Sequence, residues 1–201
     1  MGTIAVFGGT FNPIHKGHFE IISALCGKDF IDKVIIIPTK IPPHKQSSFL
    51  ADEHHRVKMC EIVSNLFSKA EVSKIELDRE GKSYTIDTLC EIKKLFPNEK
   101  IAITVGADML ISFDQWKSYK EILDISDIIT FFRKNKDINQ YNDSIDKLKN
   151  LGGKIIALDE DITDISSSQI REMIKEGLSV DRYLLPEIAN YIFSNNVYGE
   201  I

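Results

Sequence analysis

The sequence has little cysteine, no long apolar run and no excess of positive charge. Its 201 residues include only Cys26, Cys60 and Cys90, which lie far apart in apolar segments. This spacing argues against a disulfide framework, so we expect buried, reduced thiols and a cytoplasmic location. The apolar stretches are also far shorter than the roughly 20 residues that cross a bilayer.

The charge balance excludes a sequence-wide field for nucleic acid. Thirty Asp and Glu residues outweigh twenty-five Lys and Arg residues, which gives a formal net charge of −5. Any phosphate site must therefore be local. The N-terminal residues enter an apolar run without basic residues, and Val6 stands where a myristoylation signal needs Ser or Thr. We expect no export or anchoring signal, no membrane partner and no nucleic-acid partner.

Short β-branched runs alternate with segments of helical spacing along most of the chain. This alternation predicts an α/β fold, a doubly wound (Rossmann-like) parallel sheet with helices on both faces. The predicted strands are Ile4–Phe7, Val34–Ile37, Val72–Leu77, Ile101–Val105, Ile128–Phe132 and Ile155–Leu158. The predicted helices between them are near residues 18–26, 53–67, 84–96, 118–123 and 138–151.

The C-terminal part changes character, because two helical segments, 166–176 and 186–193, follow each other with no strand between them. Each has a start signal, such as Pro186 at the beginning of the second. No flexible linker, internal repeat or low-complexity tract interrupts the chain. We therefore expect one domain over residues 1–201, in which residues 165–201 form a small helical cap.

A glycine-rich turn follows the first predicted strand, where an open parallel sheet binds its ligands. Residues 7–18 read FGGTFNPIHKGH, which lacks both the Walker A pattern and the dinucleotide spacing GxGxxG. His15 and His18 stand beside the start of the next helix, whose N–H groups and dipole favour an anion. Two imidazoles and Lys16 would converge on phosphate there; a zinc site is disfavoured because no third ligand lies at suitable spacing.

A second polar segment opens the first helix of the cap. Residues 165–171 read ISSSQIR, in which Ser166 and Gln169 fit a capping box and indicate an ordinary helix start. The same segment offers three hydroxyls, free N–H groups and the guanidinium of Arg171, which binds phosphate oxygens in a bidentate manner. It therefore fits a triphosphate clamp as well.

These motifs resemble a known enzyme family over essentially the whole chain. GGTFNPIHKGH resembles the H-x-G-H signature of the nucleotidyltransferase superfamily, and ISSSQIR resembles its terminal I-S-S-T-x-I-R. SYTIDTL at residues 83–89 is similar to a motif of bacterial nicotinate-nucleotide adenylyltransferases. The resemblance implies adenylyl transfer from ATP to nicotinate mononucleotide, in the synthesis of NAD, with release of pyrophosphate.

The resemblance also implies site residues, with His15 and His18 as the catalytic pair. ATP would be bound by Gly8, Gly9, Thr10, Phe11, His15, His18, Gly106, Asp108, Ile165, Ser166, Ser167, Ser168 and Arg171. The acceptor nucleotide would be bound by His44, Lys45, Tyr84, Thr85, Trp116 and Arg133. Arg133 precedes Lys-Asn, where relatives commonly have Pro-Gly. Mg²⁺ would arrive with ATP and be held mainly by phosphates, so no protein metal site is expected.

Several alternatives stay open from the sequence. The same chemistry could act on nicotinamide mononucleotide or phosphopantetheine, and a non-catalytic nucleotide-binding module is a third possibility. A homo-oligomer is compatible with the sequence, which does not specify one. The pair His54-His55 invites a metal interpretation, but adjacent helical residues diverge and no third ligand is evident, so a structural helix is favoured.

Overall fold

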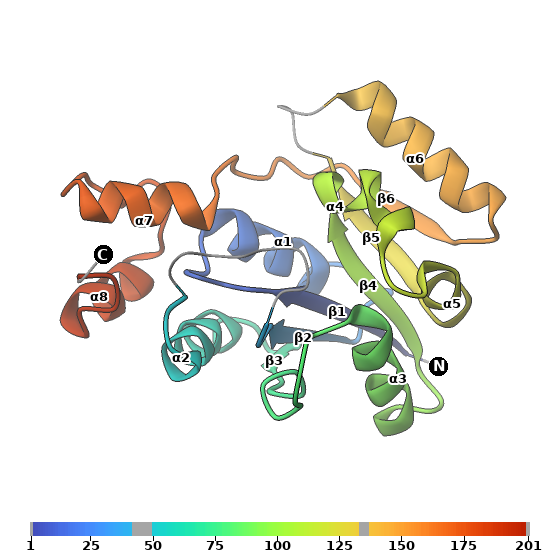
Figure 1. The fold of residues 1–201 in the computed structure, drawn as a ribbon, viewed down its shortest axis with the longest axis horizontal. Helices are drawn as coiled ribbons and strands as arrows, with labels where there is room; N and C mark the ends of the chain where they lie inside the picture. Colours follow the sequence, from blue (N-terminus) through green and yellow to red (C-terminus); the bar gives the residue numbers. More distant parts are fainter. Residues whose placement is uncertain (1, 42–49, 133–136, 200–201) are drawn as a thin grey trace.

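A computed structural model describes residues 2–41, 50–132 and 137–199. Within these ranges six strands form one parallel sheet in the order β3-β2-β1-β4-β5-β6. Figure 1 shows the sheet running through the molecule, with α7 and α8 at the end opposite α6. The strands are β1 Thr3–Gly9, β2 Lys33–Pro38, β3 Ala70–Val72, β4 Lys100–Gly106, β5 Asp127–Phe131 and β6 Ile155–Leu158.

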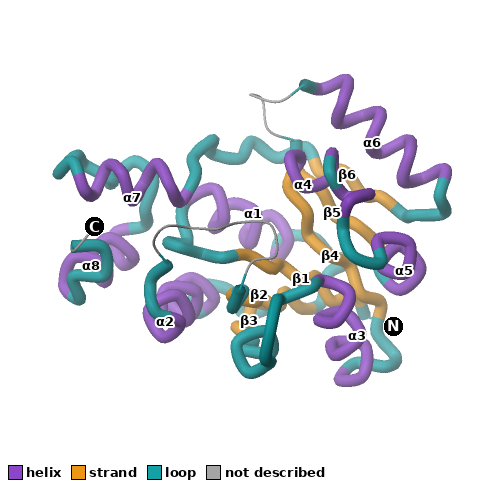
Figure 2. Tube along the Cα trace, in the orientation of Figure 1, coloured by secondary structure: helices purple, strands orange, loops and turns teal. Residues whose placement is uncertain are grey.

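Helices connect successive strands, and the alternation continues to β6 (Figure 2). They are α1 Lys16–Cys26, α2 Glu53–Ser64, α3 Thr85–Leu95, α4 Ala107–Ile111, α5 Tyr119–Ile125 and α6 Ile138–Asn150, with a 3-10 turn η1 at Phe113–Gln115. Two more, α7 Ser167–Lys175 and α8 Pro186–Ser194, form the C-terminal cap. The doubly wound parallel sheet with a helical end is therefore confirmed. No helix in the described ranges is long and apolar enough to span a bilayer.

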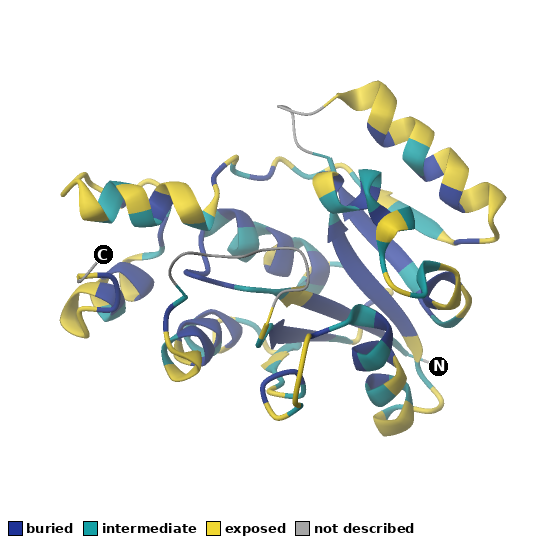
Figure 3. Cartoon of the chain, viewed as in Figure 1, coloured by how far each residue is buried: buried dark blue, intermediate teal, exposed yellow. Residues whose placement is uncertain are grey.

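Alternate residues of the strands face two separate hydrophobic cores. On one face, Phe7 and Ile36 pack with residues of α1, α2, α7 and α8. On the other face, Val6 and Ile37 pack with residues of α3, α4, α5 and α6. Figure 3 shows that the strands are mostly buried, because helices cover both faces of the sheet.

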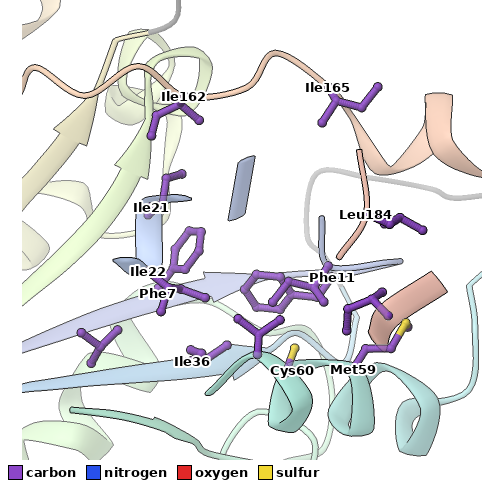
Figure 4. Close-up of a cluster of buried hydrophobic side chains, with 14 of the residues drawn as sticks. Phe7, Phe11, Ile21, Ile22, Ile36, Met59, Cys60, Ile162, Ile165 and Leu184 are labelled. Carbon is purple, nitrogen blue, oxygen red and sulfur yellow. The ribbon is translucent and has the colours of Figure 1, made fainter. Parts of the chain in front are cut away.

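The cap belongs to the first of these cores. Ile162, Ile165 and Leu184 come from the C-terminal part of the chain and lie in the same buried cluster as Phe7 and Phe11 (Figure 4). Burying such side chains stabilises the cap against the sheet by roughly 1.5–3 kcal/mol per large apolar residue. The cap thus packs in the same core as Phe11, which lies in the loop that follows β1.

The third predicted strand is wrong in position. β3 is Ala70–Val72, whereas the prediction was Val72–Leu77. Residues beyond Val72 turn instead, and the N–H groups of Leu77 and Asp78 both donate to the carbonyl of Lys74. Ile75 and Leu77 still pack inward. The apolar run therefore indicated that these residues are buried, and not that their backbone is extended. The sequence also gave no sign of the short elements α4 and η1.

The cysteines are less uniform than expected. Cys60 is buried, and burial raises the pKa of its thiol. Cys26 is only half-buried and Cys90 is exposed on α3, so the prediction of three buried thiols is wrong for these two. Cys90 falls on the solvent side of α3 because Leu89 and Ile92 already supply its apolar face.

Candidate active site

The loop after β1 begins at the carboxyl edge of the sheet, between the strands where the order reverses. β1 pairs with both β2 and β4, which is the position where doubly wound sheets bind nucleotides. A Cβ on Gly9 would lie 2.9 Å from the ring of the buried Phe11, so a larger residue there would require that ring to move. Phe11 itself has φ 47°, a conformation that turns the chain sharply and is uncommon for a bulky residue. Gly8 is exposed, which leaves its backbone open to a ligand.

His15 and His18 lie side by side at the start of α1. His15 is the N-cap residue, and its N–H donates to Nδ1 of His18 over 3.3 Å. The two rings stack with centroids 3.7 Å apart, and the ring of Phe11 meets His18 edge-on at 5.0 Å. Because Nδ1 of His18 accepts a hydrogen bond, a neutral imidazole carries its proton on Nε2. That N–H is a donor suited to a phosphate oxygen.

Close packing accounts for Gly17, the glycine between the two histidines. A Cβ there would lie 2.8 Å from the carbonyl oxygen of Thr163 and 3.3 Å from the ring of His15. The segment that leads into α7 therefore passes directly over α1. It is held there by Glu20, whose carboxylate accepts from the N–H and the hydroxyl of Thr163 at 2.6 and 2.7 Å.

The start of α7 docks onto the β1 loop. Ser167 Oγ donates to the carbonyl of Pro13 at 2.9 Å, and Arg171 donates to the carbonyl of Asn12 at 2.7 Å. Arg171 also donates to Ser168 Oγ at 3.2 Å. The structure thus brings the two sequence motifs together, as the clamp hypothesis requires.

The ordinary helix-start interpretation holds at the same time. Ser166 and Gln169 form the capping box, with Gln169 N donating to Ser166 Oγ at 3.3 Å. Ile165 is buried in the core, which leaves its backbone rather than its side chain for a ligand. Because the capping box takes the N–H of Gln169, the N–H groups of Ser167 and Ser168 are those of the first turn that can meet an anion.

The C-terminal residues also hold the β1 loop, through Asn12. Its buried Oδ1 accepts from the hydroxyl of Tyr198 at 3.0 Å and from the N–H of Ala51 at 3.1 Å. The N–H of Lys16 donates to the carbonyl of Tyr183 at 2.9 Å. Burial raises the pKa of Tyr198, so its hydroxyl stays a donor at neutral pH. The cap therefore fixes the β1 loop and the start of α1.

Sequence reasoning missed Arg56, which lies on α2 and is fully buried. Its guanidinium donates to the carbonyls of Thr10 at 3.0 Å, Thr39 at 2.7 Å and Ala51 at 3.0 Å. It joins the β1 loop to the segment after β2, and burial lowers its pKa. A sequence signal was present, because Arg56 shares the i, i+3, i+4, i+7 face of α2 with Met59, Cys60 and Val63.

Two of the predicted acceptor residues lie at the start of α3. Tyr84 is the N-cap residue and Thr85 the first residue of that helix. The ammonium group of Lys117 lies 4.3 Å from the ring centroid of Tyr84 and 3.3 Å from a carboxylate oxygen of Asp87. These contacts place the segment that contains Trp116 against α3, although the two are about 30 residues apart in sequence.

Trp116 is half-buried and packs against Phe113, with ring centroids 4.9 Å apart. Its Nε1 is buried and makes no hydrogen bond to another described residue. Trp116 therefore anchors η1 on the second core, while the residue as a whole is only partly buried.

Gly106 and Asp108 lie at the next strand end. Gly106 closes β4, pairs with Phe131 and caps α4, and a Cβ there would meet open space. Asp108 is exposed on the first turn of α4. Three predicted residues, His44, Lys45 and Arg133, lie outside the described residues.

The protein donors of the site are imidazole, hydroxyl, guanidinium and backbone N–H groups, which suit phosphate oxygens. Magnesium instead prefers oxygen ligands and keeps several waters. In the part of the chain that the structure describes, no three His, Cys, Asp or Glu side chains are grouped as metal ligands. The donor set of the described residues therefore fits phosphate groups.

Comparison with known proteins identifies the family. Residues 6–173 match the family described as cytidylyltransferase-like. The chain is 35% identical over 196 residues to a probable nicotinate-nucleotide adenylyltransferase of Carboxydothermus hydrogenoformans, and the alignment covers 97% of each chain. It is 36% identical to the corresponding protein of Dictyoglomus thermophilum, with 97% and 98% coverage.

Solved structures agree on the fold. The nicotinic acid mononucleotide adenylyltransferase of Plasmodium falciparum, complexed with APC, superposes with a TM-score of 0.80 at 21% identity and covers 99% of this chain. The same enzyme complexed with NaAD gives a TM-score of 0.79. Together with the sequence relatives, these results show that the chain belongs to the nicotinate-nucleotide adenylyltransferase family, within the cytidylyltransferase-like proteins.

Proposed function

We propose that this chain transfers the adenylyl group of ATP to nicotinate mononucleotide and releases pyrophosphate. The observation that carries the proposal is the docking of Ser167 and Arg171 on the β1 loop, which leads into the stacked pair His15 and His18 at the switch point of the sheet. Family membership, at about 35% identity over nearly the full length, fixes the reaction class.

The acceptor supplies its own nucleophile. Its 5′-phosphate monoester is ionised near neutral pH, so no general base is needed. One of its oxygens attacks the α-phosphorus of ATP, and the bond from that phosphorus to the oxygen bridging the β-phosphorus breaks. Pyrophosphate leaves with both electrons of that bond. The enzyme's task is positioning and stabilisation of charge.

The ATP half of the site, formed by residues 8–18 and 165–171, would perform most of this task. His18 would donate from Nε2 to the transferred phosphoryl group, and His15 would hold the neighbouring phosphates. Ser167, Ser168 and the N–H groups of α7 would bind the β- and γ-phosphates, with Arg171 placed to bridge them and the loop. Gly106 and Asp108 would border the adenosine.

The acceptor half, formed by residues 84–88 and 113–117, would hold the pyridine nucleotide. The first N–H groups of α3, near Thr85, suit the nicotinate carboxylate, and the Trp116 ring suits the pyridinium face. A neutral carboxamide would gain less from these donors, which favours nicotinate over nicotinamide. His44, Lys45 and Arg133 stay proposals as phosphate ligands.

Mg²⁺ bound to ATP would offset the charge of the departing pyrophosphate. We further propose that residues 1–201 act as one domain with 165–201 as its helical subdomain, and that the enzyme works in the cytoplasm. A homo-oligomer is compatible with this function and is not required by it.

The test is pyrophosphate release by the purified protein with Mg·ATP and one acceptor at a time. Nicotinate mononucleotide, nicotinamide mononucleotide and phosphopantetheine are compared. We expect clear preference for nicotinate mononucleotide. Preference for nicotinamide mononucleotide or phosphopantetheine would make that compound the acceptor instead. Binding of ATP without pyrophosphate release with any of the three acceptors would make the protein a non-catalytic nucleotide binder.

A further inference from the structure

Glu76 is a buried carboxyl group that the proposed reaction does not use. It lies between β3 and α3, and the residue is 6% exposed. Its Oε2 is buried and makes no hydrogen bond of standard length and angle to a described residue. Burying a carboxyl group is costly unless neighbouring polar groups hold it, so its surroundings need an explanation.

One side of Glu76 holds the first turn of α3. Its Oε1 accepts from the hydroxyl of the buried Thr88 at 2.8 Å. The same Thr88 oxygen accepts from Arg79 at 3.0 Å, and Arg79 pairs with Glu91 at 2.7 Å. Thr88 lies three residues after Thr85, so the network fixes the end of α3 that carries the acceptor residues.

The other side of Glu76 faces the segment after β2. Lys40 donates to the carbonyls of Leu77 and Arg79 at 2.8 and 3.1 Å, and the N–H of Ser83 donates to the carbonyl of Ile41 at 3.2 Å. The N–H of Thr39 donates to the carbonyl of Gly9 at 2.8 Å. Residues 76–83 therefore lie between α3 and a segment that itself contacts the β1 loop.

Burial and the neighbouring polar groups have opposite effects on the pKa of Glu76. Burial raises its pKa, while the hydroxyls of Thr88, Ser83 and Thr39 and the positive charge of Arg79 oppose that rise. The carboxyl group thus serves as an acceptor shared by α3 and the segment after β2, and it is too enclosed to meet a reacting phosphate.

We propose that Glu76 is a positioning residue for the acceptor half of the site: through Thr88 it fixes the start of α3 against the segment after β2, and so sets the affinity for the pyridine nucleotide without setting that for ATP. This inference rests on the proposed function. It assigns to the Glu76–Thr88 hydrogen bond a role in substrate binding as well as in folding.

The experiment compares Glu76→Ala, Glu76→Gln, Thr88→Val and the double variant Glu76→Ala/Thr88→Val with the parent enzyme. Ser126→Ala is the matched control, since it removes another buried hydroxyl, bonded at 2.9 Å to the carbonyl of Ile122. Pyrophosphate release gives KM for ATP and for nicotinate mononucleotide separately. Quenching of the single tryptophan, Trp116, by nicotinate mononucleotide gives a Kd without turnover.

We expect Glu76→Ala and Thr88→Val each to raise the KM and Kd for nicotinate mononucleotide about tenfold, as loss of one buried hydrogen bond allows. The KM for ATP should change by less than about twofold, because the ATP half uses other contacts. The double variant should resemble Thr88→Val, because that single variant already removes the Glu76–Thr88 bond together with the bond from Arg79. Glu76→Gln keeps the Oε1 acceptor and should restore most of the affinity, and Ser126→Ala should leave both KM values unchanged.

Parallel changes of the two KM values, or an unchanged acceptor KM in Thr88→Val, would overturn the inference. Equal losses in Glu76→Gln and Glu76→Ala would overturn it too, because charge rather than the shared acceptor would then matter. Thr88→Val is close in size to the native residue, which keeps the test valid if Glu76→Ala fails to fold. A parent enzyme that neither turns over nor binds nicotinate mononucleotide would instead overturn the proposed function, and this inference with it.

Discussion

The two halves of the site are held in place by contacts of very different range. In the ATP half, Arg171 and Asn12 are 159 residues apart, and Tyr198 and Asn12 are 186 apart. In the acceptor half, Lys117 and Asp87 are 30 residues apart, and Glu76 and Thr88 only 12. The helices that open onto the two halves also pack on opposite faces of the sheet.

This difference separates the requirements of the two halves. The ATP half is complete only when the C-terminal cap has packed behind the β1 loop, so a long chain segment must be ordered before its contacts form. The acceptor half is assembled from neighbouring segments. Arg56, which bonds to Thr10 and Thr39, ties the ATP half to the segment after β2 and, within the described chain, makes no hydrogen bond to residues 84–88 or 113–117. Variants that damage one half should therefore leave the other half's substrate affinity nearly unchanged.

The largest effect is expected for His18→Ala. Losing a donor to the transferred phosphoryl group should lower kcat at least about a hundredfold, or roughly 2.7–4 kcal/mol. Pyrophosphate release measures the loss, and circular dichroism checks the fold. His54→Ala, at an exposed histidine on α2, is the control and should keep its activity. Retention of more than about a tenth of kcat by His18→Ala would contradict this role.

Arg171→Ala should act on ATP alone. Loss of charge-assisted hydrogen bonds of about 1.5–3 kcal/mol predicts a KM for ATP raised by roughly 10- to 100-fold. Arg171→Lys should recover part of this, because it keeps the charge and loses the planar fork. Measurement of the KM for ATP and the KM for nicotinate mononucleotide shows whether Arg171 acts on ATP alone. A matching rise for nicotinate mononucleotide would show that the halves are not separable.

Trp116→Ala should act on nicotinate mononucleotide and leave the KM for ATP nearly unchanged. Removing the ring should raise the KM for nicotinate mononucleotide by about twofold to 30-fold, from a stacking and cation–π contribution of roughly 0.5–2 kcal/mol. Trp116→Phe keeps an aromatic face and should lose less. Isothermal titration with nicotinate mononucleotide is the direct measurement. An unchanged affinity would place the pyridine ring elsewhere.

The smallest effect concerns pH. Burial raises the pKa of Glu76 above its ordinary value of 4.5, so the folded state holds this proton to higher pH than the unfolded state. Its contribution to stability is therefore complete below pH 4.5 and declines as the pH rises through the folded pKa. Glu76→Gln removes that decline, and urea unfolding at pH 4 and pH 7 measures it. The variant should gain stability relative to the parent at the higher pH; the reverse order would show that Arg79 and the hydroxyls outweigh burial.

Much of the fold followed from local patterns. Five of the strands lie where β-branched runs predict them, since such runs are typical of buried parallel strands. β3 was misplaced because Ile75 and Leu77 are buried from a turn, and periodicity does not distinguish these cases over a short run. Arg56 was passed over because two of the three carbonyls that it bonds, those of Thr10 and Thr39, come from other segments that only the fold brings to it.

The sequence alone determined the loop chemistry of this protein. Its glycines, paired histidines, hydroxyls and Arg171 are suited to phosphate by residue type and by their places at strand and helix ends. Only the tertiary structure decided which groups meet. Ser167 and Arg171 bond to Pro13 and Asn12, and Glu76 bonds to Thr88, because the packing of helices on the sheet brings these segments together. The physical reason is that type and period are local properties, whereas a hydrogen bond requires two groups that the whole fold must place.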